Sequence, residues 1–293
     1  MKNLGVLNPE VLGLLASMWE SEAEAMLDQI GLAPGASCID LGCGAAGILR
    51  PLSVRVGAAG RVVGLEPDPR LLAAARRYAG EQALSNVQVL AGDIFDGALP
   101  FHGAPPFDGA PPLGAFDLVH ARFLAAVHGR GPELLREMLA LAGPGGVVAM
   151  QEPVANTWRC YPARPAWDRL VQTIAMALGR AGGDLSAGQR TYRLFRRAGL
   201  EDVRVRAAVV ALQDAHPLMR LPVLLADALR PQILEGGLLE EAELDDMLRA
   251  GESSALDGET FVTSFLVTQV WGRRSSAVPP HPYLAAHLQQ GAA

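Results

Sequence analysis

Short apolar runs alternate along the chain with longer stretches in which apolar residues recur every three or four positions. The first pattern is typical of buried strands and the second of amphipathic helices, so their alternation predicts an α/β fold around a parallel sheet. The expected strands are 38–41, 61–66, 87–90, 116–120, 147–151, 203–212 and 261–271. The expected helices between them are 45–52, 70–82, 132–141, 167–178 and 188–198.

Two further helical regions flank this alternation. Residues 8–30 predict one helix, because Asn8 can cap it and Pro9 suits its first position. That helix could cover the sheet or act as a lid over a bound ligand, and the pattern does not separate these alternatives. Residues 218–234 and 240–249 are also helical in pattern. They lie in the segment that connects the strands expected at 203–212 and 261–271, and this segment is long enough to form a helical cap.

Residues 97–115 read GALPFHGAPPFDGAPPLGA, a near repeat that is dense in proline and glycine. Neither a helix nor a sheet tolerates that density, so a surface loop is expected before the strand at 116–120. Residues 275–293 are polar and contain proline. They are expected to be loose, or to dock on the partner chain of a homodimer.

Composition narrows the class of protein. Half of the 293 residues are hydrophobic and 19% are charged, which provides a sizeable core. The net charge of −6 argues against nucleic-acid binding, and neither a membrane-length apolar run nor a signal peptide is recognisable. An odd number of cysteines, Cys38, Cys43 and Cys160, favours a reducing cytoplasm over a disulfide framework. We therefore expect a cytoplasmic protein without nucleic-acid or membrane partners.

A glycine turn follows the first expected strand. Gly42, Gly44 and Gly47 have the spacing of a nucleotide-binding turn, where backbone can approach a ligand closely. Asp40 ends the strand before the turn. A carboxylate there is unfavourable for a pyrophosphate and suits a ligand that carries a cation.

Two more strands end in acidic residues. Glu66 ends the second strand, 24 residues after Gly42 in the sequence. An acidic residue at that sequence separation is suited to binding both hydroxyls of a ribose. Asp93 follows the third strand through residues 91–92. Since open parallel sheets bind ligands at the carboxyl ends of their strands, Asp40, Glu66 and Asp93 are expected to face one crevice.

The chain contains, in this order, DLGCGAAG, VVGLEPDPRLLAAAR, NVQVLAGDIFD, FDLVHARFL and LAGPGGVVAMQEP. From about residue 32 to 152, and again near 261–273, it resembles the class I S-adenosylmethionine-dependent methyltransferases, and within them the small-molecule enzymes of bacterial secondary metabolism. The resemblance implies a Rossmann-like seven-stranded sheet, mostly parallel with an antiparallel last strand, helices on both faces and S-adenosylmethionine as cofactor. One departure is Ala46, where the family usually has glycine; its methyl group would lie close to the methionine part.

The same resemblance divides the chain and implies a cofactor site. The expected parts are a lid helix (1–31), the cofactor-binding core (32–212 and 261–274), a helical cap (213–260) and a loose tail (275–293). Asp40 would accept from the cofactor's ammonium group, Glu66 would bind the ribose diol, and Asp93 would accept from the adenine amino group. The cofactor-binding residues implied are Asp40, Gly42, Cys43, Gly44, Glu66, Pro67, Gly92, Asp93, Ile94, His120, Ala121 and Arg122.

Methyl transfer from a sulfonium is an in-line displacement with a neutral leaving group, so alignment of the reacting atoms contributes most. A base is needed when the acceptor is a phenol, an alcohol or a protonated amine. The candidate bases are His120, His128, His216, Glu152 and Tyr161, and each histidine is more often structural than catalytic. No cluster of residues has metal-ligand spacing, so no metal is expected.

The acceptor is expected in a chamber formed by the N-terminal helix around Trp19, the stretch 152–161 and the cap from His216 onward. These segments are apolar or aromatic, and Trp19, Trp158 and Tyr161 are the expected contacts of a small hydrophobic acceptor. Two alternatives remain. The fold could use S-adenosylmethionine in a non-methyl reaction such as a cyclisation, and the glycine pattern alone would also suit a nicotinamide dehydrogenase, against which Asp40 argues.

Overall fold

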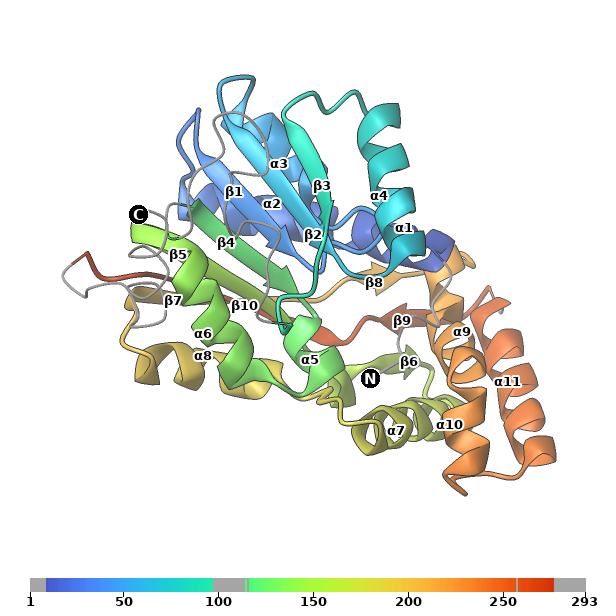
Figure 1. Cartoon of the computed structure of the whole chain (residues 1–293). Helices are drawn as coiled ribbons and strands as arrows, with labels where there is room; N and C mark the ends of the chain where they lie inside the picture. Colours follow the sequence, from blue (N-terminus) through green and yellow to red (C-terminus); the bar gives the residue numbers. More distant parts are fainter. Residues whose placement is uncertain (1–8, 97–113, 115, 257, 277–293) are drawn as a thin grey trace.

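Seven strands form the central sheet in the order β3-β2-β1-β4-β5-β10-β7 (Figure 1). The structure is a computed structural model and describes residues 9–96, 114, 116–256 and 258–276. The first five strands of this sheet are parallel, and β10 runs antiparallel to both of its neighbours, which confirms the predicted Rossmann-like arrangement. The strands are β1 (Ser37–Leu41), β2 (Arg61–Glu66), β3 (Val87–Ala91), β4 (Phe116–Arg122), β5 (Ala142–Val154), β7 (Glu201–Ala208) and β10 (Leu266–Arg273).

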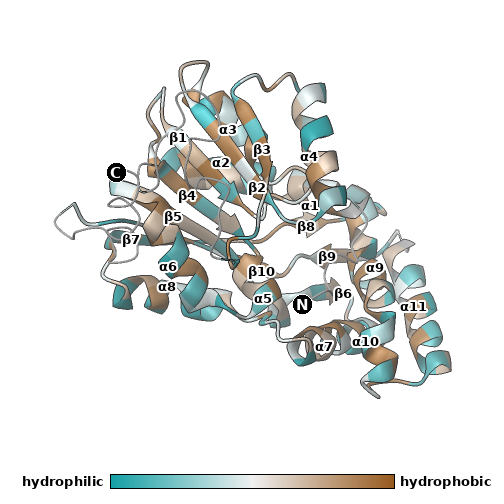
Figure 2. Ribbon diagram, in the orientation of Figure 1, coloured by the Kyte–Doolittle hydropathy of each residue, from teal (hydrophilic) through white to brown (hydrophobic). Residues whose placement is uncertain are grey.

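Helices cover both faces of this sheet, which explains why its central strands are almost continuously apolar. One face packs against α2 (Glu20–Ile30), α3 (Leu49–Val56) and α4 (Pro69–Glu81). The other packs against α5 (Leu124–His128), α6 (Gly131–Leu141) and α8 (Gly188–Arg197). Figure 2 shows apolar residues concentrated on the strands and on the helix sides that face them.

The glycine turn is longer than predicted. Residues 44–48 form turns, and α3 begins at Leu49 and not at residue 45. By contrast, α4 begins where local chemistry predicts, since Asp68 accepts from the backbone N–H of Arg70 at 2.8 Å and Pro69 occupies the first position.

A second sheet was not predicted. Its strands β6 (Arg159–Tyr161), β9 (Phe261–Thr263) and β8 (Ala211–Leu212) are antiparallel in the order β6-β9-β8. The single strands expected at 203–212 and 261–271 are each divided between the two sheets. At the crossing the N–H of Ser264 donates to the carbonyl of Val210 at 2.8 Å, while the N–H of Val210 donates to the Ser264 hydroxyl at 2.9 Å.

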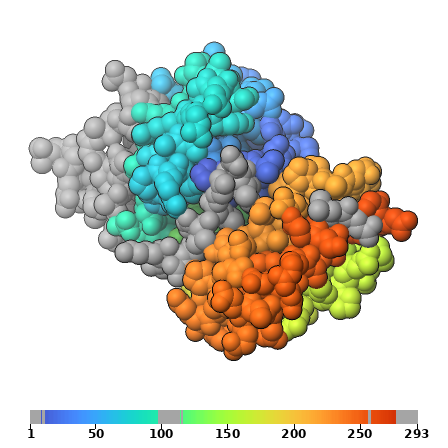
Figure 3. Space-filling model, turned by 90° about the vertical axis from the view of Figure 1, so that its right-hand side faces the viewer, coloured from blue at the N-terminus to red at the C-terminus, as the bar shows by residue number. Residues whose placement is uncertain are grey.

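Beside the second sheet lies a helical layer of α7 (Pro165–Arg180), η2 (Pro217–Arg220), α9 (Leu221–Ala228), α10 (Arg230–Glu235) and α11 (Glu241–Leu256). The helix expected at 218–234 is interrupted at Leu229, because Pro231 at the start of α10 cannot donate into a continuing helix. Figure 3 shows α9 and α11 (orange) and α4 (cyan) on separate sides of one molecular face.

The N-terminal helix is two helices, α1 (Pro9–Met18) and α2, which are separated at Trp19. Trp19 is fully buried, and α2 contributes Met26 and Leu27 to the core beneath the sheet. Of the expected lid helix, α1 therefore remains a candidate for a moving element, whereas α2 belongs to the folded core. The expected loop at 97–115 lies outside the described residues except for Gly114, as does the tail from residue 277.

Candidate active site

The glycine turn places backbone next to open space and next to Asp40. Gly42, Gly44 and Gly47 have φ values of 61°, 59° and 53°, which favour glycine. A Cβ atom on Gly44 would meet no heavy atom within 4 Å, whereas one on Gly47 would lie 2.0 Å from Oδ2 of Asp40. Gly47 is therefore required by packing inside the protein, while Gly44 borders space that a ligand can enter.

Asp40 is held rigidly behind this turn. Its carboxylate is 1% exposed, and Oδ2 accepts from the backbone N–H of Ile48 at 3.0 Å. Oδ1 lies 2.6 Å from Nδ1 of His120 on the neighbouring strand. The side chain is thus positioned by the protein itself.

Glu66 connects the end of β2 to the same turn. Its carboxylate accepts from the N–H of Gly44 at 2.8 Å and from that of Asp68 at 2.9 Å. Burial raises the pKa of Glu66, and the two N–H donors lower it in part. A carboxylate oxygen has further lone pairs, so Glu66 can accept from additional hydroxyl groups at this edge.

Arg122 places a cation beside the turn. Its Nη2 donates to the carbonyl of Gly47 at 3.2 Å, and its Nη1 is buried without a hydrogen-bond partner in the part of the chain that the structure describes. Burial lowers the pKa of the Arg122 guanidinium, and the negative charges of Asp40 and Glu20 act in the opposite direction. A buried guanidinium nitrogen of this kind suits a carboxylate.

At the other end of the edge, Asp93 is held by a local turn in which its Oδ1 accepts from the N–H of Phe95 at 2.9 Å. Ile94 is buried in the core. The ring of His128 lies 4.9 Å from that of Phe95, and burial lowers the pKa of His128. His128 therefore belongs to the Asp93 end of the sheet edge.

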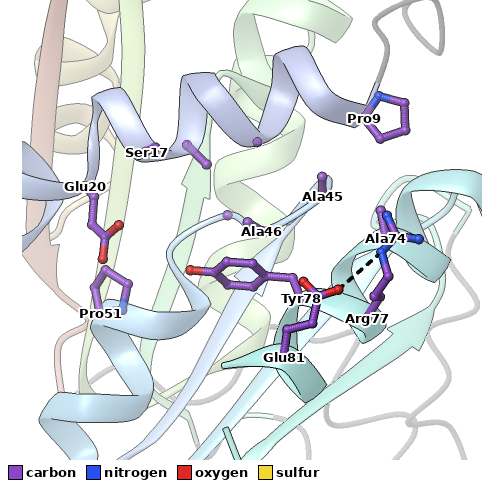
Figure 4. A pocket seen from close by; sticks show the side chains of 13 residues that line it. Pro9, Ser17, Glu20, Ala45, Ala46, Pro51, Ala74, Arg77, Tyr78 and Glu81 are labelled. Atoms are coloured by element: carbon purple, nitrogen blue, oxygen red, sulfur yellow. Dashed lines mark ion pairs between the residues drawn. The ribbon is translucent and has the colours of Figure 1, made fainter. Parts of the chain in front are cut away.

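A cavity of about 250 Å³ lies between α1, the glycine turn and α4. In Figure 4, Ser17 comes from α1, Ala45 and Ala46 from the turn, and Tyr78 from α4. Ala46 thus lines a cavity that α1 borders on one side. That α1 acts as a lid stays a prediction.

His120 and Glu152 are engaged inside the fold. His120 is fully buried, with Nδ1 at Asp40 and Nε2 at 2.9 Å from Nε2 of Gln151, so both ring nitrogens have partners inside the fold, and a role as base stays a prediction. Glu152 is also fully buried, and it accepts from the N–H groups of Ala125 at 2.9 Å and Ala126 at 3.0 Å. It therefore anchors the start of α5.

The buried Glu152 predicts a pH-dependent stability. Burial raises its pKa from 4.5 to about 8, so between these values the folded protein keeps a proton that the unfolded chain loses. The contribution of this bound proton to the free energy of unfolding is complete at low pH and is lost as pH rises through 8. Urea unfolding from pH 5 to 9 should show the free-energy difference between the parent and Glu152→Gln shrinking with pH. Parallel curves would assign the carboxylate another environment.

Two other candidate bases lie in the second sheet and the turn beside the helical layer. His216 is exposed and caps η2, since its Nδ1 accepts from the N–H of Leu218 at 3.2 Å. Tyr161 is 42% exposed and stacks on Phe261 with ring centroids 4.8 Å apart. Within the described residues, neither side chain contacts Asp40, Glu66 or Arg122.

An aromatic cluster joins the expected acceptor segments. Trp19 and Trp158 both contact Phe265, with centroid separations of 5.8 and 5.3 Å. Phe123, which directly follows Arg122, lies 5.7 Å from Phe265 and 6.4 Å from Trp19. Phe265 was missed from sequence because it sits within what read as one continuous strand. The φ of Phe123 is 61°, which is uncommon for a non-glycine residue. Backbone conformations of this kind occur often at active sites and ligand-binding loops.

Among the residues that the structure describes, no helix is both long and apolar enough to span a membrane. Within the same residues, no group of three or more histidine, cysteine or acidic side chains could hold a metal ion.

Comparisons with known proteins agree with this geometry. A family model described as a methyltransferase domain matches residues 32–199. The chain is 31% identical to nocamycin O-methyltransferase from Saccharothrix syringae over 82% of this chain and 72% of that protein. It is 34% identical to 2-phytyl-1,4-naphtoquinone methyltransferase from Thermosynechococcus vestitus over 49% of this chain and 56% of that protein.

Solved structures support the fold. A putative methyltransferase from Bacillus halodurans superposes with a TM-score of 0.55 at 14% identity, over 86% of this chain and 98% of that one. Phosphoethanolamine N-methyltransferase 2 from Haemonchus contortus, in complex with S-adenosyl-L-methionine, superposes with a TM-score of 0.51 at 14% identity, over 87% of this chain and 52% of that one. The chain therefore belongs to the class I S-adenosylmethionine-dependent methyltransferases and is an enzyme that takes S-adenosylmethionine as its cofactor.

Proposed function

We propose that this enzyme methylates an oxygen, nitrogen or carbon atom of a small hydrophobic metabolite that binds against the aromatic cluster of Trp19, Phe123, Trp158 and Phe265. The observation that carries the proposal is the adjacency of Arg122 and Phe123. The Arg122 guanidinium lies beside the glycine turn and 5.9 Å from the centre of the Phe123 ring. A largely buried apolar cluster thus begins one residue beyond the cofactor edge.

The residues at that edge fit the proposed cofactor. Arg122, whose buried Nη1 has no hydrogen-bond partner among the described residues, would hold the carboxylate of the methionine part. The buried Asp40 would serve the ammonium group, directly or through water. Glu66 would accept from the ribose hydroxyls, and Asp93 from the adenine amino group. When bound, the cofactor supplies an activated methyl group on a sulfonium with a neutral leaving group. The protein's contribution is to bind, align and exclude water.

The aromatic cluster also offers a polar contact. The indole Nε1 of Trp19 is buried and has no hydrogen-bond partner within the described residues. Tryptophan N–H is a donor, so it suits an oxygen or nitrogen atom on an otherwise apolar acceptor. Nocamycin O-methyltransferase, which aligns with 82% of this chain, is named for O-methylation. This name favours an oxygen as the first acceptor atom to test.

The direct test is a product mass. The enzyme is incubated with methyl-labelled S-adenosylmethionine and a panel of phenols, enols, quinols and hydrophobic amines. A mass increase of one labelled methyl group on an acceptor is expected. Conversion of an acceptor without that increase would instead support a non-methyl reaction such as a cyclisation.

Phe265→Leu should raise the KM for the acceptor and leave cofactor affinity unchanged. Aromatic contacts are worth ~0.5–1.5 kcal/mol beyond their area, so roughly a threefold to tenfold rise is expected. Phe261→Leu is the matched control, because Phe261 lies four residues earlier on β9, is 42% exposed and stacks on Tyr161. Equal KM changes in the two variants would move the acceptor away from the cluster.

A further inference from the structure

A row of polar side chains crosses the central sheet on the face that α2 covers. Asp40, His120, Gln151, Gln269 and Arg206 come from β1, β4, β5, β10 and β7, which are consecutive neighbours in the sheet (Figure 1). Asp40 is 1% exposed, and the next three are fully buried. Polar groups in a core are costly unless each one finds a partner. This row satisfies that condition through its own members.

The contacts are continuous from strand to strand. His120 Nδ1 lies 2.6 Å from Asp40 Oδ1, and Gln151 Nε2 lies 2.9 Å from His120 Nε2. Gln269 Nε2 donates to Gln151 Oε1 at 2.9 Å, and Arg206 Nη1 donates to Gln269 Oε1 at 2.8 Å. One chain of hydrogen bonds thus joins a cation to a carboxylate across the sheet.

The far end of the row is tied to α2. Gln269 Nε2 also donates to the backbone carbonyl of Glu22 at 3.0 Å. The Glu22 carboxylate forms an ion pair with Arg206 at 2.5 Å. Glu22 lies three residues after Trp19, so the row connects the helix that follows the aromatic cluster to the carboxylate behind the glycine turn.

These end groups fix the direction of every hydrogen bond. A guanidinium can only donate and a backbone carbonyl can only accept, so Gln269 must turn its oxygen to Arg206 and its nitrogen to Glu22. Gln151 must then offer its oxygen to Gln269 and its nitrogen to His120. Since amide orientations and histidine tautomers follow from such networks, Nε2 of His120 accepts, and the ring proton sits on Nδ1.

We propose that Arg206 is a positioning residue for cofactor binding. Through Gln269 and Gln151 it keeps the His120 proton on Nδ1, where it donates to Asp40 and holds that carboxylate behind the glycine turn. Arg206 lies four strands from Asp40 in the sheet order. The inference rests on the proposed function, in which Asp40 serves the methionine end of the cofactor.

The first experiment compares Arg206→Met with Arg204→Met. Arg204 is a matched control because it lies two residues earlier on β7 and is exposed. Calorimetry should show S-adenosylmethionine binding to Arg206→Met about threefold to thirtyfold more weakly than to the parent, which is within the range that mutations along a coupled network can reach. Arg204→Met should bind like the parent. Equal affinities of the two variants would overturn the proposal.

A second experiment reads the tautomer without cofactor. Ring ¹⁵N spectra of the parent should show His120 neutral and protonated at Nδ1; its signals are assigned by their loss in His120→Asn. A parent protonated at Nε2 would overturn the direction of the row.

The two experiments separate failure of this inference from failure of the proposed site. Asp40→Asn in the same calorimetry tests the site directly. If Asp40→Asn bound S-adenosylmethionine like the parent while the His120 proton sat on Nδ1, the assignment of Asp40 to the cofactor would be wrong, and Arg206 would lose its proposed role with it. If Asp40→Asn weakened binding while Arg206→Met did not, the coupling alone would be wrong.

Discussion

Gly44→Val is expected to abolish detectable binding of S-adenosylmethionine, a loss of roughly a hundredfold or more in affinity. Gly44 has a φ of 59°, and a Cβ atom there would meet no protein atom within 4 Å. The branched side chain would therefore project into the open space in front of the turn, where backbone must approach the ligand closely. Calorimetric titration with S-adenosylmethionine and with its demethylated product measures the effect.

Backbone strain alone could also weaken the protein, so the control is Gly57→Val. Gly57 ends α3 with a φ of 65°, and a Cβ atom there likewise meets nothing within 4 Å. Both variants should lose stability in thermal melts because valine disfavours positive φ, but Gly57→Val should keep the parent affinity. A Gly44→Val variant that bound the cofactor normally would place the site elsewhere.

Glu66→Ala is expected to weaken cofactor binding by about tenfold to a hundredfold. A hydrogen bond to a charged group is worth roughly 1.5–3 kcal/mol, and Glu66 would accept such bonds from the ribose hydroxyls. The structure adds a second reason. Glu66 also accepts from the N–H of Gly44 and from that of Asp68, so its loss frees the glycine turn as well. Equilibrium titration with S-adenosylmethionine measures the change.

Asp93→Ala is the comparison for this experiment. It should cost less than Glu66→Ala, because a neighbouring backbone amide can still bind the adenine. In the structure Asp93 accepts from the N–H of Phe95, in a local turn separate from the glycine turn. The ribose assignment would not survive a Glu66→Ala variant that binds as tightly as the parent, or one that binds more tightly than Asp93→Ala.

Several elements could be predicted because their causes are local. The second strand was expected at 61–66 and is observed as Arg61–Glu66, since an apolar run between turn residues has few other conformations. The start of α4 follows from Asp68 and Pro69. The acidic strand ends could also be placed at one edge, because parallel strands present their carboxyl ends together.

Other features depend on contacts between distant residues. The alternation at 203–212 continues across the point where the chain leaves one sheet for the other, so the sequence pattern contains no sign of the division. The break at Trp19 has the same origin: the apolar stripe continues through it, and burial of the indole against Phe265 and Phe123 accompanies the interruption.

By itself, then, the sequence determined the type and order of the main strands, the glycine turn and the chemical identity of its acidic neighbours, because these depend on residues close together in the chain. The tertiary structure decided what those side chains can do. His120 and Glu152 are candidate bases by residue type. The sequence does not show that His120 contacts Gln151 on a neighbouring strand, or that Glu152 accepts from the N–H groups of Ala125 and Ala126 at the start of α5. Strand order and burial determine which partners a polar side chain has, and both are established only when the sheet assembles.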